Sequence, residues 1–264
     1  MCGSYAVLDS DFIIKSWKIQ KDSASPLCAV FFRLPYRYVC HDQVKTEINR
    51  GNGGGECQWF TDSVSTDVIS VYSDKELITL LKEAYSYSSF YTAFCHYASL
   101  LKTSCAPFSK YIYSKYDFSS LNENSSPDEI INTIQIGDKE TGNDSHLGEI
   151  KSLVLIQILQ LVTNKTVFLF CSDDRPARNT LKAELPENTF SCLSILGVFW
   201  LIKEKHLLSQ TESEYYFTSF LQLHAGQSTF KIKDGSLAGN DIFHRIWDNT
   251  LILRADGLLE NHHV

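Results

Sequence analysis

The sequence contains no long apolar run. Its most apolar stretch, residues 194–202, is far shorter than the roughly 18 residues that a membrane-spanning helix requires. The first residues also lack the basic start and apolar centre of a secretory signal peptide. We therefore expect a cytoplasmic protein with no membrane partner.

Several catalytic and metal-binding signatures are missing as well. The eight cysteines include no C-x-x-C pair, so we expect no structural zinc, which needs closely spaced ligands. In a reducing compartment these thiols are expected to pack as small apolar side chains. No G-x-S-x-G elbow of a serine hydrolase occurs. The glycine-rich residues 51–55 are not followed by the Lys and Ser or Thr of a phosphate-binding loop.

The composition is that of an ordinary globular protein. Apolar residues make up 44% and charged residues 21% of the chain, which excludes a disordered chain, a collagen-like repeat and a coiled-coil rod. The 24 basic and 31 acidic residues give a net charge of −7. This excess of acid argues against a broad basic surface for duplex nucleic acid. It leaves room for a local basic strip beside a metal-bound active site.

Short apolar segments alternate with amphipathic ones along the chain. Residues 4–8 and 166–171 are continuous apolar runs, typical of buried strands in a parallel sheet. Residues 146–162 keep the 3.6-residue period of a helix, and residues 75–103 are predicted as one long helix. The alternation predicts an α/β fold, a three-layer sandwich with a mainly parallel central sheet.

Acidic residues stand where such a sheet binds its ligands. Asp9 follows the first predicted strand, and Asp173 and Asp174 follow a later one. Glu47 and Glu149 lie early on predicted helices, beside apolar positions. Ligands bind beyond the carboxyl ends of parallel strands, and clustered carboxylates repel one another unless a proton or cation joins them. The pattern therefore predicts an all-oxygen site for Mg²⁺ or Mn²⁺, which suits phosphodiester hydrolysis.

Each acid also has a simpler interpretation. Asp9 and the Asp173–Asp174 pair can cap the helices that follow them, and Glu149 can offset a helix dipole. Glu47 can be a solvated helix residue. If the chain is an unrelated α/β protein, these carboxylates lie scattered with no common centre. We favour the shared metal site because apolar strands precede two of the acidic positions.

Four motifs, in this order, resemble those of the PIN-domain ribonucleases, in particular a prokaryotic subgroup. They are Tyr5-Ala-Val-Leu-Asp9-Ser-Asp11, Val44-Lys-Thr-Glu47, His146-Leu-Gly-Glu149 and Phe168-Leu-Phe-Cys-Ser-Asp173-Asp174-Arg175-Pro-Ala-Arg178. The later Ser194-Ile-Leu-Gly197-Val is similar to the segment that follows the last acid in that subgroup. The resemblance covers most of residues 4–208 and is weak between about 52 and 136.

The resemblance implies a divalent-metal-dependent endoribonuclease, acting on single-stranded or structured RNA. Its metal ligands, and hence catalytic residues, would be Asp9, Glu47, Glu149, Asp173 and Asp174. Many members of the family are toxins held inactive by a protein antitoxin, so an inhibitor is a possible partner, as is a homodimer. The alternative is a catalytically inactive PIN-like module that binds without metal in a nucleic-acid or toxin–antitoxin complex.

Three further residues are candidates for substrate binding. By the resemblance, Ser172 corresponds to the small hydroxyl residue that often precedes the last acid. Arg175 and Arg178 can contact a substrate phosphate, or can instead pair with a nearby acid. Asp11 is expected to cap a helix or to support the site.

The domain arrangement follows from the extent of the resemblance. We expect a PIN-like nuclease domain over residues 1–208, with a helical insert around 52–136. Residues 209–264 are expected to form a C-terminal helical extension packed on the same domain. The aromatic residues between 85 and 97 are expected to pack in a core or dimer face rather than to stack on bases.

Overall fold

A five-stranded parallel sheet forms the centre of the protein. The computed structural model describes residues 4–21, 25–50, 55–142, 146–163, 168–185 and 190–262. The strands are β1 (Tyr5–Leu8), β2 (Arg37–His41), β3 (Ile69–Tyr72), β4 (Phe168–Cys171) and β5 (Phe190–Leu193), in the spatial order β3-β2-β1-β4-β5. Every neighbouring pair is parallel. The predicted α/β fold is confirmed. Residues 51–54 of the glycine-rich segment lie outside the described residues.

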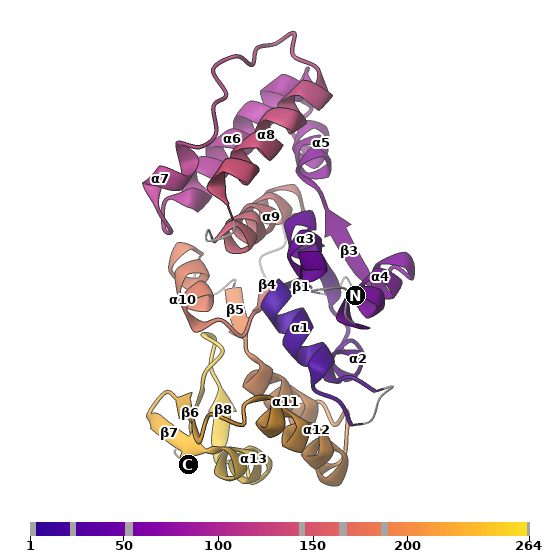
Figure 1. Cartoon of the computed structure of the whole chain (residues 1–264), viewed down its shortest axis with the longest axis vertical. Coiled ribbons are helices and arrows are strands. Elements are labelled where there is room, and N and C mark those ends of the chain that lie inside the picture. The colour runs from indigo at the N-terminus through magenta and orange to yellow at the C-terminus, as the bar shows by residue number, and fades with distance from the viewer. Residues whose placement is uncertain are drawn as a thin grey trace.

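Helices cover both faces of the sheet and give the three expected layers (Figure 1). One face packs against α1 (Ser10–Lys18), α2 (Leu27–Phe31), α3 (Asp42–Arg50), α4 (Gly55–Ser65) and α11 (Ile195–Glu204). The other packs against α5 (Asp74–Ala84), α6 (Phe90–Cys105), α9 (Leu147–Thr163) and α10 (Arg175–Glu184). No helix within the described ranges is long and apolar enough to cross a lipid bilayer.

The central strands β1 and β4 are apolar throughout because both of their faces are covered. Leu8 and Cys171 belong to one buried cluster, whereas Val7 and Phe170 belong to the other. This alternation is the two-residue period of a strand. A strand buried on both faces has no polar face to alternate with, which is why the sequence shows continuous apolar runs at these places.

The helical insert packs at one end of the molecule, at the top of Figure 1. The prediction of one helix over 75–103 is wrong, because the chain forms α5 and α6 with a turn between them. Ser86 has a φ of 52° there, and Ser89 caps α6 by accepting a hydrogen bond of 3.0 Å from the Thr92 amide.

Two further helices, one short and one long, complete the insert. They are α7 (Lys110–Tyr113) and α8 (Pro127–Thr141). Helix α8 continues through Gly137 to Thr141, and residues 143–145 are outside the described ranges. Gly137 stays helical and lets the ring of Tyr116 pack directly on the helix.

A buried ionic network joins the insert to the sheet. Lys151 of α9 has no exposed surface, and its Nζ lies 2.9 Å from Asp74 Oδ2 and 3.1 Å from Asp138 Oδ2. Asp74 also contacts Tyr97 of α6 and lies 3.1 Å from His41 Nε2 at the end of β2. Burial by itself would raise the pKa of Asp74, but Lys151 and His41 hold it well below its ordinary value. The network therefore fixes four helices and a strand to one another.

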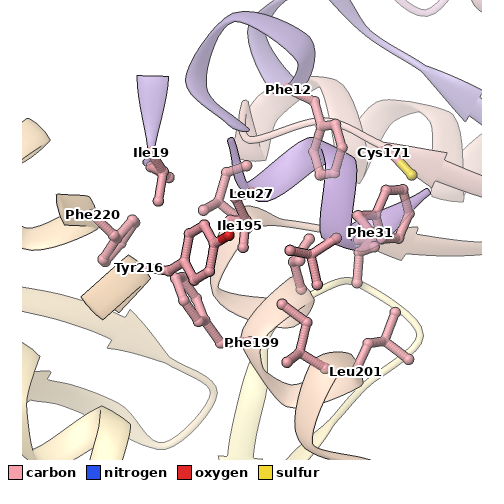
Figure 2. Close-up of a cluster of buried hydrophobic side chains, with 14 of the residues drawn as sticks. Phe12, Ile19, Leu27, Phe31, Cys171, Ile195, Phe199, Leu201, Tyr216 and Phe220 are labelled. Atoms are coloured by element: carbon pink, nitrogen blue, oxygen red, sulfur yellow. The ribbon is translucent and has the colours of Figure 1, made fainter. Parts of the chain in front are cut away.

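The C-terminal segment is partly helical and partly β. The expected helical extension contains two helices, α12 (Gln210–Leu223) and α13 (Gly239–Trp247). It also contains two antiparallel hairpins that we did not predict: β6 (Thr229–Ile232) with β7 (Gly235–Ala238), and β8 (Leu251–Leu253) with β9 (Leu259–Asn261). Figure 2 shows Tyr216 and Phe220 of α12 beside Ile19 and Leu27, in the same buried cluster.

We expect Lys151→Met to lower the free energy of unfolding by about 3–5 kcal/mol, because it leaves two buried aspartates without their cation. Urea unfolding followed by circular dichroism measures this. The matched control is Lys139→Met, which removes an exposed lysine from α8 and should change stability by less than about 0.5 kcal/mol. Equal effects of the two substitutions would show that the network does not hold the insert in place.

Candidate acidic site at the carboxyl edge of the sheet

The candidate site lies where the strand order reverses. β2 is on one side of β1 and β4 is on the other. The chain segments that follow β1 and β4 therefore run in opposite directions from the carboxyl ends of these strands. Ligands bind at this point in sheets of this kind. Leu8 pairs with Cys171 at these ends, and the Asp9 amide donates a hydrogen bond of 3.0 Å to the Cys171 carbonyl. Asp9 and Ser172 are therefore neighbours although 163 residues separate them.

Asp9 is buried and is both a helix cap and a member of an acidic group. Its Oδ1 accepts a bond of 2.8 Å from the Ser10 amide, and its Oδ2 accepts one of 2.7 Å from the Ser172 hydroxyl. Burial raises the pKa of Asp9 to about 8, and the nearby carboxylates of Glu149 and Glu47 add to the rise. Asp9 therefore caps a helix and also belongs to the group of acids, so both interpretations of this residue apply.

Glu47 and Glu149 face the same place from two helices. Glu47 Oε2 accepts a bond of 2.7 Å from the Ser10 hydroxyl, and its Oε1 accepts one of 3.1 Å from Gln43 Nε2. Gly148 leaves the space that this carboxylate occupies, because a Cβ there would lie 2.8 Å from Glu47 Oε1. Burial raises the pKa of Glu149, and His146, whose Nδ1 lies 3.4 Å from Glu149 Oε1, opposes that rise.

Asp173 belongs to a second part of the site, in which a lysine balances the negative charge. Its Oδ2 lies 2.9 Å from Lys15 Nζ, which is also 3.0 Å from Asp11 Oδ2. Its Oδ1 accepts a bond of 3.2 Å from the Ile195 amide, at the start of α11. Although burial opposes it, Asp173 and Asp11 raise the pKa of Lys15 above its ordinary value. The chain thus supplies a cation to this pair of acids.

The remaining candidates lie around Ser172. The Asp174 amide donates to Ser172 Oγ at 3.2 Å, and Asp174 stands at the cap position of α10 without a capping bond from its side chain. Arg178 is buried, and its Nη1 donates a bond of 2.7 Å to the Ser172 carbonyl. Arg175 is exposed in the first turn of α10. Within the described residues neither arginine forms an ion pair with an acid.

The predicted acids thus form two adjoining groups instead of one shared metal site. Asp9, Glu47 and Glu149 act on one another electrostatically, whereas Asp173 is bonded to Lys15. Across the described ranges, no three His, Cys, Asp or Glu side chains are arranged so that they could hold a metal ion. Hydroxyl and ammonium groups of the chain bond several of these carboxylates directly.

Sequence reasoning missed Ser10 and Lys15, the two residues of α1 that hold the acids. The spacing of four between Asp11 and Lys15 predicts an ion pair on one helix face, and that pair is present. Nothing in the local sequence indicates that the same ammonium group reaches Asp173, or that the Ser10 hydroxyl reaches Glu47.

Comparison with protein-family models, with curated proteins and with solved structures finds no match for this chain. The resemblance to PIN-domain ribonucleases therefore stays a prediction, and functional inference depends on the geometry of the site.

We expect Asp9→Asn to stabilise the fold in the presence of a chelator, and to do so more at pH 8 than at pH 5. The unfolded carboxyl group ionises near its ordinary pKa of 3.8, whereas the folded one ionises near 8. The wild type therefore loses stability as pH rises between these values, by up to about 1.4 kcal/mol per pH unit, and the neutral amide does not. The Ser172 hydroxyl can rotate to accept a bond from the amide.

Urea unfolding at both pH values measures the difference. Asp241→Asn, at an exposed position of α13, is the control. A gap between wild type and Asp9→Asn that stays constant with pH would contradict the raised pKa.

Proposed function

We propose that the protein is a divalent-metal-dependent endoribonuclease, a hydrolase that cuts RNA phosphodiester bonds at the carboxyl edge of its sheet. The observation that carries this proposal is the Asp9 carboxyl group, which is buried beside Glu47 and Glu149 at the junction of β1 and β4. An acid with a strongly raised pKa at the ligand-binding edge of an α/β sheet is characteristic of a functional site.

The carboxylate donors suit Mg²⁺ or Mn²⁺ in their chemistry, although within the described residues they are not arranged as a ready metal site. Carboxylate oxygens are the ligands that these hard cations prefer, and Asp9, Glu47 and Glu149 would hold the ion. A cation would favour the ionised form of Asp9, which burial and the neighbouring acids disfavour. When bound, such an ion supplies an activated water and neutralises charge at the scissile phosphate.

The other residues of the chain would position the substrate and the acids. Lys15 and the exposed Arg175 place positive charge beside the carboxylates, where a phosphate group can bind. Ser172 orients Asp9 through its hydroxyl, and Arg178 holds the Ser172 carbonyl. Asp173 and Asp174 would contribute from the far side of Ser172, with Asp173 keeping Lys15 in place.

A second candidate is a PIN-like module that binds nucleic acid without cutting it. One observation favours it: in the part of the chain that the structure describes, no three potential ligands form a ready metal site. This candidate predicts RNA binding that is independent of metal. The homodimer, the protein inhibitor and the cytoplasmic location implied earlier stay predictions.

The first test is cleavage of fluorescent single-stranded RNA and DNA with Mg²⁺ or Mn²⁺. We expect Asp9→Asn and Glu149→Gln each to lower the rate at least about a hundredfold, because each removes charge that holds the cation. Asp241→Asn should cut at the wild-type rate. Undiminished cleavage by Asp9→Asn, or by wild type in EDTA, would refute the proposal.

The second test measures the cation itself. We expect Mn²⁺ to raise the melting temperature of the wild type, since an ion at about 100 times its Kd adds about 2.7 kcal/mol of stability. Asp9→Asn and Glu47→Gln should lose most of this shift. A non-catalytic module would show equal melting temperatures with and without Mn²⁺ in all three proteins.

A further inference from the structure

A cleft of about 480 Å³ adjoins the acidic site. One of its walls comes from the sheet layer and carries Lys15, Asp173, Arg175 and Arg178. The facing wall comes from the C-terminal segment, which lies at the bottom of Figure 1. Asp173 and Lys15 belong to both the acidic site and the cleft, so a ligand that leaves the site enters the cleft directly.

The cleft is basic although the protein is acidic. Lys15, Arg175, Arg178 and Lys231 line it, against the single acid Asp173, whereas the whole chain has a net charge of −7. Lys231 is exposed on β6, and within the described ranges it forms no ion pair. Charge of one sign concentrated in a concave surface attracts a ligand of the opposite sign.

Arg178 adds an independent sign of an anionic ligand. Only 4% of its surface is exposed, and its Nε has no hydrogen-bond partner among the described residues. Gly257, which also lines the cleft, packs closely against the guanidinium, because a Cβ there would lie 3.1 Å from Nε. A buried donor without a partner costs free energy, and a ligand oxygen in the cleft would satisfy it.

The facing wall also offers aromatic surface. The His224 ring lies 4.5 Å from the ring of Phe220 and 5.8 Å from that of Phe230, measured between centroids. Its Nδ1 bonds the Phe220 carbonyl at 2.9 Å, which fixes the ring. Histidine and phenylalanine rings are surfaces on which unpaired bases stack.

We propose that the cleft binds the backbone of a single-stranded polynucleotide next to the scissile bond. Arg175 and Lys231 contact phosphates from opposite walls, Arg178 donates to one of them, and His224 stacks on a base. The volume of about 480 Å³ lies within the range of small-ligand sites, about 300–1,000 Å³, so a short segment of one strand can enter the cleft. This inference rests on the proposed function, and it assigns the C-terminal segment the task of holding the substrate.

The test compares two lysines of the same hairpin in the full chain. Lys231→Glu reverses a charge in the cleft, whereas Lys233→Glu reverses the charge of an exposed residue in the β6–β7 turn that does not line the cleft. The probe is a fluorescent single-stranded RNA of about ten nucleotides. Its binding is followed by anisotropy in EDTA, so cleavage plays no part. Melting curves confirm that both variants fold.

We expect Lys231→Glu to weaken binding at least about tenfold and to reduce the dependence of log Kd on log salt by about 0.7. Lys233→Glu should change Kd less than about twofold, because salt screens a charge outside the cleft. Equal effects of the two substitutions would overturn the proposal. So would binding of inorganic pyrophosphate, followed by calorimetry, in a protein that does not bind the RNA.

The outcome also separates this proposal from the nuclease proposal. If binding in EDTA depends on Lys231 but no condition gives cleavage, the cleft assignment stands and hydrolysis fails. If the protein cuts RNA through Asp9 while Lys231→Glu binds and cuts like wild type, hydrolysis stands and the cleft assignment fails. In an active enzyme, Lys231→Glu should raise KM and leave kcat close to its wild-type value.

Discussion

Burial of the Asp9 carboxyl group between the ends of β1 and β4 is the constraint on which the site depends. The parallel sheet removes this group from water, and Glu47 and Glu149 lie close enough to oppose its ionisation. The fold therefore holds an arrangement of acids that it does not itself neutralise. Arrangements of this kind persist in proteins where a ligand, a proton or a cation completes them.

In the Lys151 network of the same protein, the chain itself supplies the cation that balances the buried acids. Lys151 is fully buried, yet two aspartates and a tyrosine bond its ammonium group. Both networks lie beyond the carboxyl ends of the strands, and both contain buried acids. The difference is that a lysine supplies the positive charge in one network, whereas among the described residues no lysine or arginine pairs with Asp9, Glu47 or Glu149, and only His146 faces Glu149. This contrast separates a group that holds the insert in place from a group suited to chemistry.

Charge is segregated at this edge of an acidic protein, as the proposed polyanionic substrate requires. Carboxylates gather around Asp9, while arginine and lysine side chains line the neighbouring cleft. Lys15 stands at the boundary and pairs with acids on both sides of it, Asp11 and Asp173. The sheet layer thereby provides the acidic edge, and the C-terminal hairpins provide the opposite wall of the cleft. Neither part forms the cleft without the other.

The sequence alone determined the layers and the edge at which the site lies. Continuous apolar runs predicted buried parallel strands, and acids placed directly after them predicted where carboxylates meet, because both patterns are local consequences of backbone geometry. Only the tertiary structure decided which groups meet there. The Lys15–Asp173 pair spans 158 residues, and the hydrogen bond from Ser10 to Glu47 spans 37. Such contacts arise when folding brings separate elements together, and no local pattern records them.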